Sequence, residues 1–98
     1  MKVSFAREAR QDLAEIAHYL SRHNPERART FMLELRGACL DLGTMPYAFE
    51  MTDQTSLPDF RRRPFAPYLI FYKVEGSQVL VIRIIHGARE YMRMLTQK

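Results

Sequence analysis

One apolar stretch of the chain contains, and is followed by, residues that could do chemistry. The sequence QVLVIRIIHGARE, residues 78–90, has Arg83 in its middle, His86 at the end of the apolar run and Arg89 shortly after it. Ionised arginine is rarely buried without a partner, so Arg83 requires a specific contact. Guanidinium groups bind phosphates and carboxylates, and a nearby imidazole can transfer protons. These residue types therefore fit either a docking site for an anionic partner or a catalytic site acting on a phosphate.

A second basic group precedes this stretch. Arg61, Arg62 and Arg63 are consecutive, and Lys73 lies in the apolar sequence YLIFYKV. The chain from residue 57 onward contains eight Lys and Arg against three Asp and Glu, whereas the part before it contains seven against eight. A basic half predicts an acidic protein or another polyanion as partner. An edge strand kept soluble by its charges is an equally good interpretation of the three arginines.

Length and composition exclude several classes of protein. The 98 residues, 47% of them hydrophobic, are enough for one domain spanning residues 1–98. No apolar stretch approaches the roughly 20 residues that cross a bilayer, and the N-terminus lacks the pattern of a signal peptide. Cys39 is the single cysteine, which excludes an intrachain disulfide framework and a thiolate metal cluster. We therefore expect a cytoplasmic protein with no cofactor, metal or membrane contact.

Helical periodicity dominates the first half of the sequence. Residues 7–22 and 25–44 place apolar side chains three or four positions apart, which predicts two amphipathic helices. Asn24 is a good N-cap and Pro25 suits the first helical position, so a new helix is expected to begin there. A connection this short predicts an antiparallel helix hairpin. The residues expected in the core are Leu13, Ile16, Leu20, Phe31, Leu35 and Leu42.

Extended patterns lie on both sides of the hairpin. We expect a short first strand in KVSF, further strands at residues 57–63, 67–74 and 78–87, and a short closing helix in AREYMRML. The short connections between the last three strands allow only antiparallel pairing. The predicted fold is α+β, with an N-terminal strand and an antiparallel two-helix hairpin packed on one face of a three- to four-stranded antiparallel sheet.

Alternation along the strands predicts where the charged residues lie. Because side chains alternate between the two faces of a strand, Arg83 and Lys73 are expected on the side that the helices leave uncovered. They would form a basic site on an apolar floor, completed by Val79, Val81 and Ile85 beside Arg83 and by Leu69 and Phe71 beside Lys73. Structural alternatives are an ion pair of Arg83 with Glu90 or Asp59, an ion pair of Arg89 with Asp12 or Glu15, and a hydrogen-bonded His86.

The order of these elements resembles the ParE/RelE superfamily of type II toxin–antitoxin toxins nearly from end to end. AREARQDLAEIAHYL looks like the first helix of that family, with matching positions at Ala9, Asp12, Leu13, Ile16 and Tyr19. RRRPFAPYLIFYKVEGSQVLVIRIIHGAREYMRML looks like its arginine-rich strand, its YLIFY strand and the R-x-x-H-G-A-R-[DE] ending of the ParE branch. Glu90 stands where that branch more usually has aspartate, which is a mild departure.

The resemblance to ParE implies a non-enzymatic toxin that inhibits DNA gyrase, serves plasmid stabilisation and is neutralised by a ParD-like antitoxin. Sequence-specific DNA binding is not expected. Partner binding would then involve Arg61, Arg62, Arg63, Lys73, Arg83 and Arg89. The alternative is a RelE-like, ribosome-dependent mRNA endonuclease, with catalytic groups drawn from Arg61, Arg83, His86, Glu90 and Tyr91. A third interpretation is a non-toxic relic that only binds its antitoxin.

Overall fold

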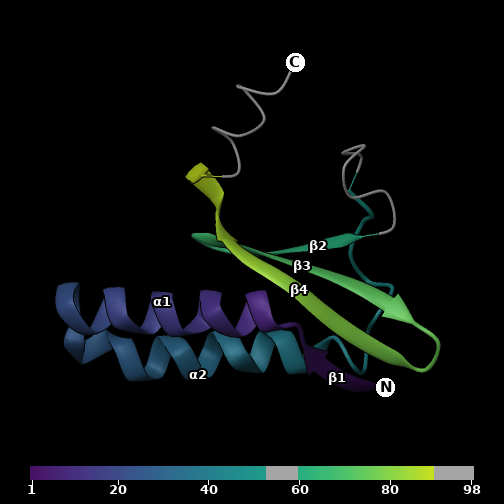
Figure 1. Cartoon of the computed structure of the whole chain (residues 1–98), viewed down its shortest axis with the longest axis horizontal. Helices are drawn as coiled ribbons and strands as arrows, with labels where there is room; N and C mark the ends of the chain where they lie inside the picture. Colours follow the sequence, from purple (N-terminus) through teal and green to yellow (C-terminus); the bar gives the residue numbers. More distant parts are fainter. Residues whose placement is uncertain (53–59, 90–98) are drawn as a thin grey trace.

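The computed structural model describes residues 1–52 and 60–89 and arranges a helix hairpin against an open sheet (Figure 1). The order of elements is the predicted one, and the first strand is present. The second helix ends at Asp41, earlier than the predicted residue 44. Residues 57–59 of a predicted strand and residues 90–95 of the predicted closing helix lie outside the described ranges. The elements are β1 (Lys2–Phe5), α1 (Arg7–His23), α2 (Pro25–Asp41), β2 (Arg61–Phe65), β3 (Tyr68–Glu75) and β4 (Gln78–His86).

The four described strands form one sheet in the order β1-β4-β3-β2. The pairs β2–β3 and β3–β4 are antiparallel, as predicted from their short connections. β1 pairs with β4 in parallel, so the sheet is mixed rather than wholly antiparallel. The helix hairpin together with β2 and β3 forms the long connection that this parallel pair requires. The last strand in the sequence therefore lies at the interior of the sheet, between the first strand and β3.

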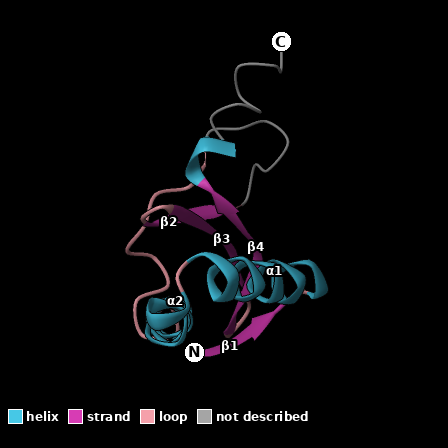
Figure 2. Ribbon diagram, turned by 90° about the vertical axis from the view of Figure 1, so that its left-hand side faces the viewer, coloured by secondary structure: helices cyan, strands magenta, loops and turns pink. Residues whose placement is uncertain are grey.

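The hydrophobic core lies between the hairpin and one face of the sheet (Figures 1 and 2). Of the six residues predicted for it, Ile16, Leu35 and Leu42 are buried, and the other three are half-buried and pack against the same cluster. The buried cluster consists of Ala9, Ile16, Leu35, Ala38, Cys39, Leu42, Tyr68, Ile70, Tyr72, Val79, Val81 and Ile84. The amphipathic pattern of both helices thus predicted which side faces the sheet.

A bulge in β4 changes which side chains face the helices. Tyr72 pairs with Val81, whereas Phe71 pairs with Arg83, so Ile82 is an extra residue without an opposite partner. Side chains beyond it are shifted by one position relative to strict alternation. Val81 and Ile84 both face the core, and the predicted common face of Val79, Val81, Arg83 and Ile85 is wrong.

Asp12 closes the edge of β4 where β1 ends. The backbone pairing with β1 stops near Val81, whose carbonyl oxygen accepts from Ala6 N at 2.9 Å. Beyond that point Asp12 Oδ2 accepts from Ile84 N at 2.8 Å and from Arg83 Nε at 2.8 Å, and Asp12 Oδ1 accepts from Arg83 Nη2 at 3.1 Å. The carboxylate is buried, with 7% of the residue exposed, yet three N–H donors stabilise its charge.

Two glycines meet steric demands at the ends of elements. Gly76 has a φ of +58° in the β3–β4 turn, a conformation that side-chain-bearing residues rarely adopt. Gly43 follows α2, and a Cβ atom built there would lie 2.3 Å from the carbonyl oxygen of Met1. The end of the helix hairpin can therefore approach β1 closely only with glycine at this position.

Leu35 and Leu33 give a matched test of the core. We expect Leu35→Ala to lower the free energy of unfolding by about 2–5 kcal/mol because it leaves a cavity in a fully buried site. Leu33→Ala, on the exposed face of the same helix, should change it by less than about 0.5 kcal/mol. Urea titrations followed by circular dichroism measure both, and equal losses would contradict the assigned helix face.

Removing the Asp12 carboxylate should destabilise the fold more than removing an exposed side chain from the same helix. Asp12→Ala leaves Arg83 and the Ile84 N–H without their acceptor, at an expected cost of about 1–3 kcal/mol. Gln11→Ala, at the exposed neighbouring position, is the control. A double-mutant cycle with Arg83→Met should show a coupling free energy clearly different from zero, and additive effects would contradict the ion pair.

Candidate functional site

The guanidinium of Arg83 is held by the helix hairpin. By register Arg83 shares a strand face with Lys73, away from the buried cluster, but its side chain reaches Asp12 of α1. The hydrogen bonds from Arg83 to Asp12 raise the pKa of the guanidinium above its ordinary value. An internal ion pair was one of the sequence-based alternatives, although Asp12 replaces the expected Glu90 or Asp59. The expectation of a basic site left uncovered by the helices is therefore wrong for the Arg83 head group.

Arg61 and Arg63 of β2 form hydrogen bonds to backbone carbonyl groups at the end of α2 and in the connection that follows it. Arg61 Nη1 donates to Phe49 O at 2.7 Å, and its guanidinium lies 5.1 Å from the centre of the Tyr47 ring. Arg63 Nη1 donates to Ala38 O at 2.8 Å and lies 5.0 Å from the Phe49 ring. Ala38 is in the last turn of α2, where carbonyl groups lack helical partners and a cation is favourable. Both arginines thus have structural roles.

Arg62 points away from these contacts and is exposed. Its backbone N donates to Glu50 O at 3.1 Å, and Met51 forms a bridge with Arg61, so residues 50–52 cover part of the β2 edge. The Arg62 side chain forms no ion pair with any residue in the described ranges. It lines an open hollow of about 500 Å³ on this edge. Of the three consecutive arginines, it is the exposed one.

Lys73 of β3 lies on the sheet face opposite the core, as predicted. Its Nζ atom is 3.4 Å from Glu75 Oε2, and both side chains are partly exposed. Such a pair contributes little to stability and can exchange partners. Lys73 therefore remains a predicted partner-binding residue.

An aromatic cleft lies between the helix hairpin and the ends of β3 and β4. We use the name aromatic cleft for the hollow of about 540 Å³ formed by α1, α2 and the ends of β3 and β4. A smaller hollow of about 130 Å³ adjoins it, sharing three of its residues and adding Arg89. The aromatic cleft is lined by Tyr19, Leu20, Phe31, Pro67, Tyr68 and His86.

His86 stands at the rim of the aromatic cleft with one ring nitrogen engaged. Its ring meets Tyr68 edge-on at 5.3 Å between centroids, and Nδ1 accepts a hydrogen bond from Ala88 N at 3.1 Å. Because Nδ1 accepts this bond, Nε2 is the ring nitrogen that can face the cleft as a donor. Burial raises the pKa of the Tyr68 hydroxyl, which keeps it protonated. The pair can therefore donate hydrogen bonds into the cleft.

The cations proposed for catalysis do not converge. Arg61 is bound at the outer edge of β2, and Arg83 is bound to α1 at the edge of β4 that β1 leaves open. β3 lies between these two strands, which places their backbones about 10 Å apart. His86 and Arg89 line one hollow together, while Tyr91 and Glu90 lie outside the described residues.

Three residues of the site could not be selected from residue type alone. Asp12 interrupts the apolar stripe of α1, and a carboxylate on a buried helix face is the one signal that could have identified it. Tyr19, which is 54% exposed, and the half-buried Phe31 form walls of the aromatic cleft. Nothing in the helical period distinguishes such residues from ordinary core or surface positions.

Cys39 provides no nucleophile, because burial raises the pKa of its thiol to about 12. Within the described ranges no cluster of three metal-binding side chains is found. The helices described there are too short or too polar to cross a membrane.

Comparisons with known proteins agree with this geometry. The family model described as "ParE toxin of type II toxin-antitoxin system, parDE" matches residues 3–91. No curated protein sequence matches. Among solved structures, the chromosomal ParDE system from P. aeruginosa is 21% identical, with 88% of this chain and 95% of that chain covered and a TM-score of 0.74.

Two further solved structures are similar at lower scores. The RelBE2 toxin–antitoxin complex from Mycobacterium tuberculosis is 18% identical over 87% of this chain and 95% of that chain, with a TM-score of 0.66. The YoeB/ParE toxin from Agrobacterium tumefaciens is 17% identical over 88% and 98%, with a TM-score of 0.57. At such identities these structures establish the shared fold, and the family model, which matches nearly the whole sequence, establishes the family. The chain belongs to the ParE family of toxins from type II toxin–antitoxin systems.

Proposed function

We propose that this protein acts in the cytoplasm as a toxin that inhibits DNA gyrase and is neutralised by a ParD-like antitoxin. The match to the ParE family motivates the choice of gyrase as the target. Its role is to bind and block the target, without a chemical step of its own. In this reading the basic and aromatic residues at the surface are docking groups.

The separation of the bound arginines is the observation that carries this proposal. RNA cleavage by 2′-hydroxyl attack needs a base, an acid and cations gathered around one phosphate. Arg61 and Arg83 are each held by internal partners at different edges of the sheet, and His86 Nδ1 accepts from Ala88 N. A phosphate placed beside Arg61 would lack Arg83, and one placed beside Arg83 would lack Arg61. Inhibition by binding requires no such convergence.

The groups that remain available suit recognition of a protein. The aromatic cleft presents Tyr19, Phe31 and Tyr68, and Arg62 on β2 and Arg89 after β4 are exposed cations. Tyrosine and arginine are enriched among residues that dominate binding energy. A disordered, amphipathic antitoxin segment could fold onto the protein with an apolar side chain in the cleft and acidic groups near the two cations.

Direct assays of both targets test the proposed mechanism. The purified protein should inhibit supercoiling by gyrase in the absence of ribosomes and should leave mRNA intact on translating ribosomes. His86→Ala should keep inhibition within a few-fold of the unchanged protein, because no proton transfer is lost. Circular dichroism of the variant controls for folding.

The opposite pattern would identify a nuclease. Codon-phased cuts in mRNA, reduced about 10²–10⁴-fold by His86→Ala while gyrase stays active, would overturn gyrase inhibition as the function. Loss of both activities in a folded His86→Ala variant would instead place His86 in a docking surface.

Charge reversal tests whether the exposed arginines of the proposed surface contact the antitoxin. Arg62→Glu and Arg89→Glu should each weaken the complex by about 0.5–2 kcal/mol, because both side chains are exposed rim groups. Neither substitution should lower the free energy of unfolding. Arg10→Glu, an equally exposed reversal on α1, is the control for a general charge effect. Isothermal titration calorimetry at two salt concentrations measures the change. Equal effects of all three reversals would contradict a localised acidic contact.

A further inference from the structure

The face of α2 turned away from the core carries an uncovered apolar stripe. Leu33 and Leu40 are 63% and 47% exposed and lie seven residues apart, so they occupy the same side of the helix. Gly37 lies between them, and a Cβ atom added there would meet no heavy atom within 4 Å. We call Leu33, Gly37 and Leu40 the outer stripe. Its two leucines and central glycine leave room for close approach of a second helix.

Opposite charges flank the two sides of the outer stripe. At 100° per residue, Arg29 and Arg36 fall on one flank, and Glu34 and Asp41 fall on the other. These are the positions that flank the seam in a heptad pattern, with the leucines at every seventh residue. An acidic partner would be attracted by one flank and repelled by the other, whereas a second copy of this helix carries the complementary arrangement.

The charges also select the orientation of the second copy. In a parallel pair, each flanking residue meets the residue five positions later on the other copy, so Arg29 faces Glu34 and Arg36 faces Asp41. In an antiparallel pair the arginine flanks would face one another and so would the acidic flanks. Like charges at such distances are unfavourable, and a parallel two-fold arrangement is therefore preferred.

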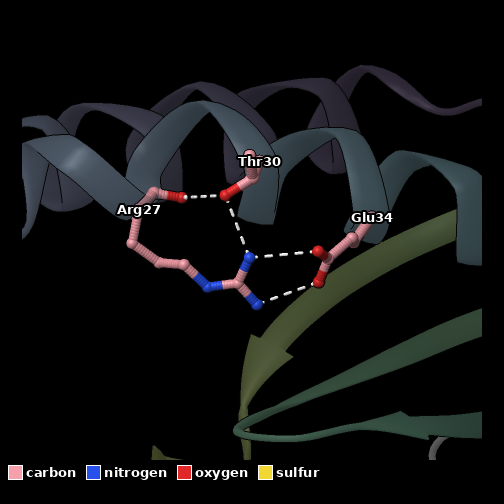
Figure 3. Close-up of polar contacts among 3 residues, drawn as sticks. All are labelled: Arg27, Thr30 and Glu34. Carbon is pink, nitrogen blue, oxygen red and sulfur yellow. Dashed lines mark hydrogen bonds and ion pairs between the residues drawn. The ribbon is translucent and has the colours of Figure 1, made fainter.

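Local contacts hold the flanks in place without occupying the stripe. On the acidic flank, Arg27 donates to both Glu34 oxygens at 2.9 and 3.0 Å and to Thr30 Oγ1 at 3.0 Å (Figure 3). This bond lowers the pKa of Glu34, which keeps the carboxylate ionised. Both side chains of the pair are about half exposed, so Glu34 can be shared with another arginine. On the basic flank, Arg36 lies 5.4 Å from the Phe5 ring.

A hollow of about 310 Å³ beside Leu33 completes the surface. It is formed by Leu13 of α1 with Met32 and Leu33 of α2, between the two flanking arginines. This hollow lies between α1 and α2 on the basic flank of the outer stripe, where a side chain of a second copy could enter it. The outer stripe thus has both projecting leucines and a place to receive them.

We propose that the outer stripe of α2 is a homodimer interface, in which α2 helices of two copies pack in parallel about a two-fold axis. The seam spans only two heptads, so the dimer is weak and forms as concentration rises. The aromatic cleft lies between the hairpin and the sheet, away from this face, and stays open in the dimer. The inference is independent of which target the protein inhibits.

Sedimentation velocity of the full chain over a range of concentrations tests self-association. We expect a monomer–dimer equilibrium whose dissociation constant rises at least about tenfold in Leu33→Glu and Leu40→Glu, because a charge is placed in the seam. Met51→Glu is the matched control, since Met51 is 48% exposed and lies beside β2, where it forms a bridge with Arg61, and it should leave the equilibrium unchanged. A protein that stays monomeric at every concentration would overturn the proposal, as would equal effects of all three substitutions.

Disulfide trapping distinguishes the parallel from the antiparallel arrangement. Leu40→Cys should cross-link to its own counterpart in a parallel dimer, whereas in an antiparallel one Leu40→Cys would cross-link only with Leu33→Cys. Native Cys39 is buried and leaves the new thiols as the reactive ones. Asp41→Arg should weaken the dimer, and adding Arg36→Glu should restore it. Preferential cross-linking of the mixed pair, or no rescue by the double reversal, would reject the parallel seam.

Discussion

The buried carboxylate of Asp12 is the interaction on which the arrangement of helices and sheet depends. β1 covers only the first half of the β4 edge, because the chain must leave the sheet to begin α1. Asp12, one and a half turns into that helix, accepts from the Ile84 N–H and from Arg83 on the uncovered half. The helix therefore continues the hydrogen bonding that the short strand ends, and α1 is fixed along the strand it crosses.

Several other cations act in the same way, as internal ties between backbone segments. Arg63 reaches a carbonyl group in the last turn of α2, and Arg61 reaches the carbonyl group of Phe49. The Arg63 bond joins β2 to α2, two segments that have no strand pairing with one another, and each arginine also lies over an aromatic ring. The basic character of the C-terminal half is thus partly structural, and its excess charge overstates the surface offered to partners.

The sequence was informative where local patterns decide the structure. Helical spacing identified the hairpin and its buried face, and short turns required the antiparallel order of β2, β3 and β4. The bulge at Ile82 could not be read from alternating residues, because an extra residue shows only when the partner strand is known. The Asp12–Arg83 pair spans most of the chain, so its partners could be named only from the fold. For the same reason, residue types marked the arginines as important without separating Arg62, which is exposed, from Arg61 and Arg63, which are bonded internally.

The parallel pairing of β1 with β4 also has a consequence for the order of folding. Lys2 is opposite Gln78, so the first strand finds its place only after nearly the whole chain has been synthesised. The helix hairpin can form early because its contacts are local, whereas joining the two ends requires closure of a long loop. β4 is then the piece that completes the core, since it touches β1, β3 and α1 at once. A nascent chain interrupted before this strand retains a helix hairpin whose apolar face has nothing to cover it.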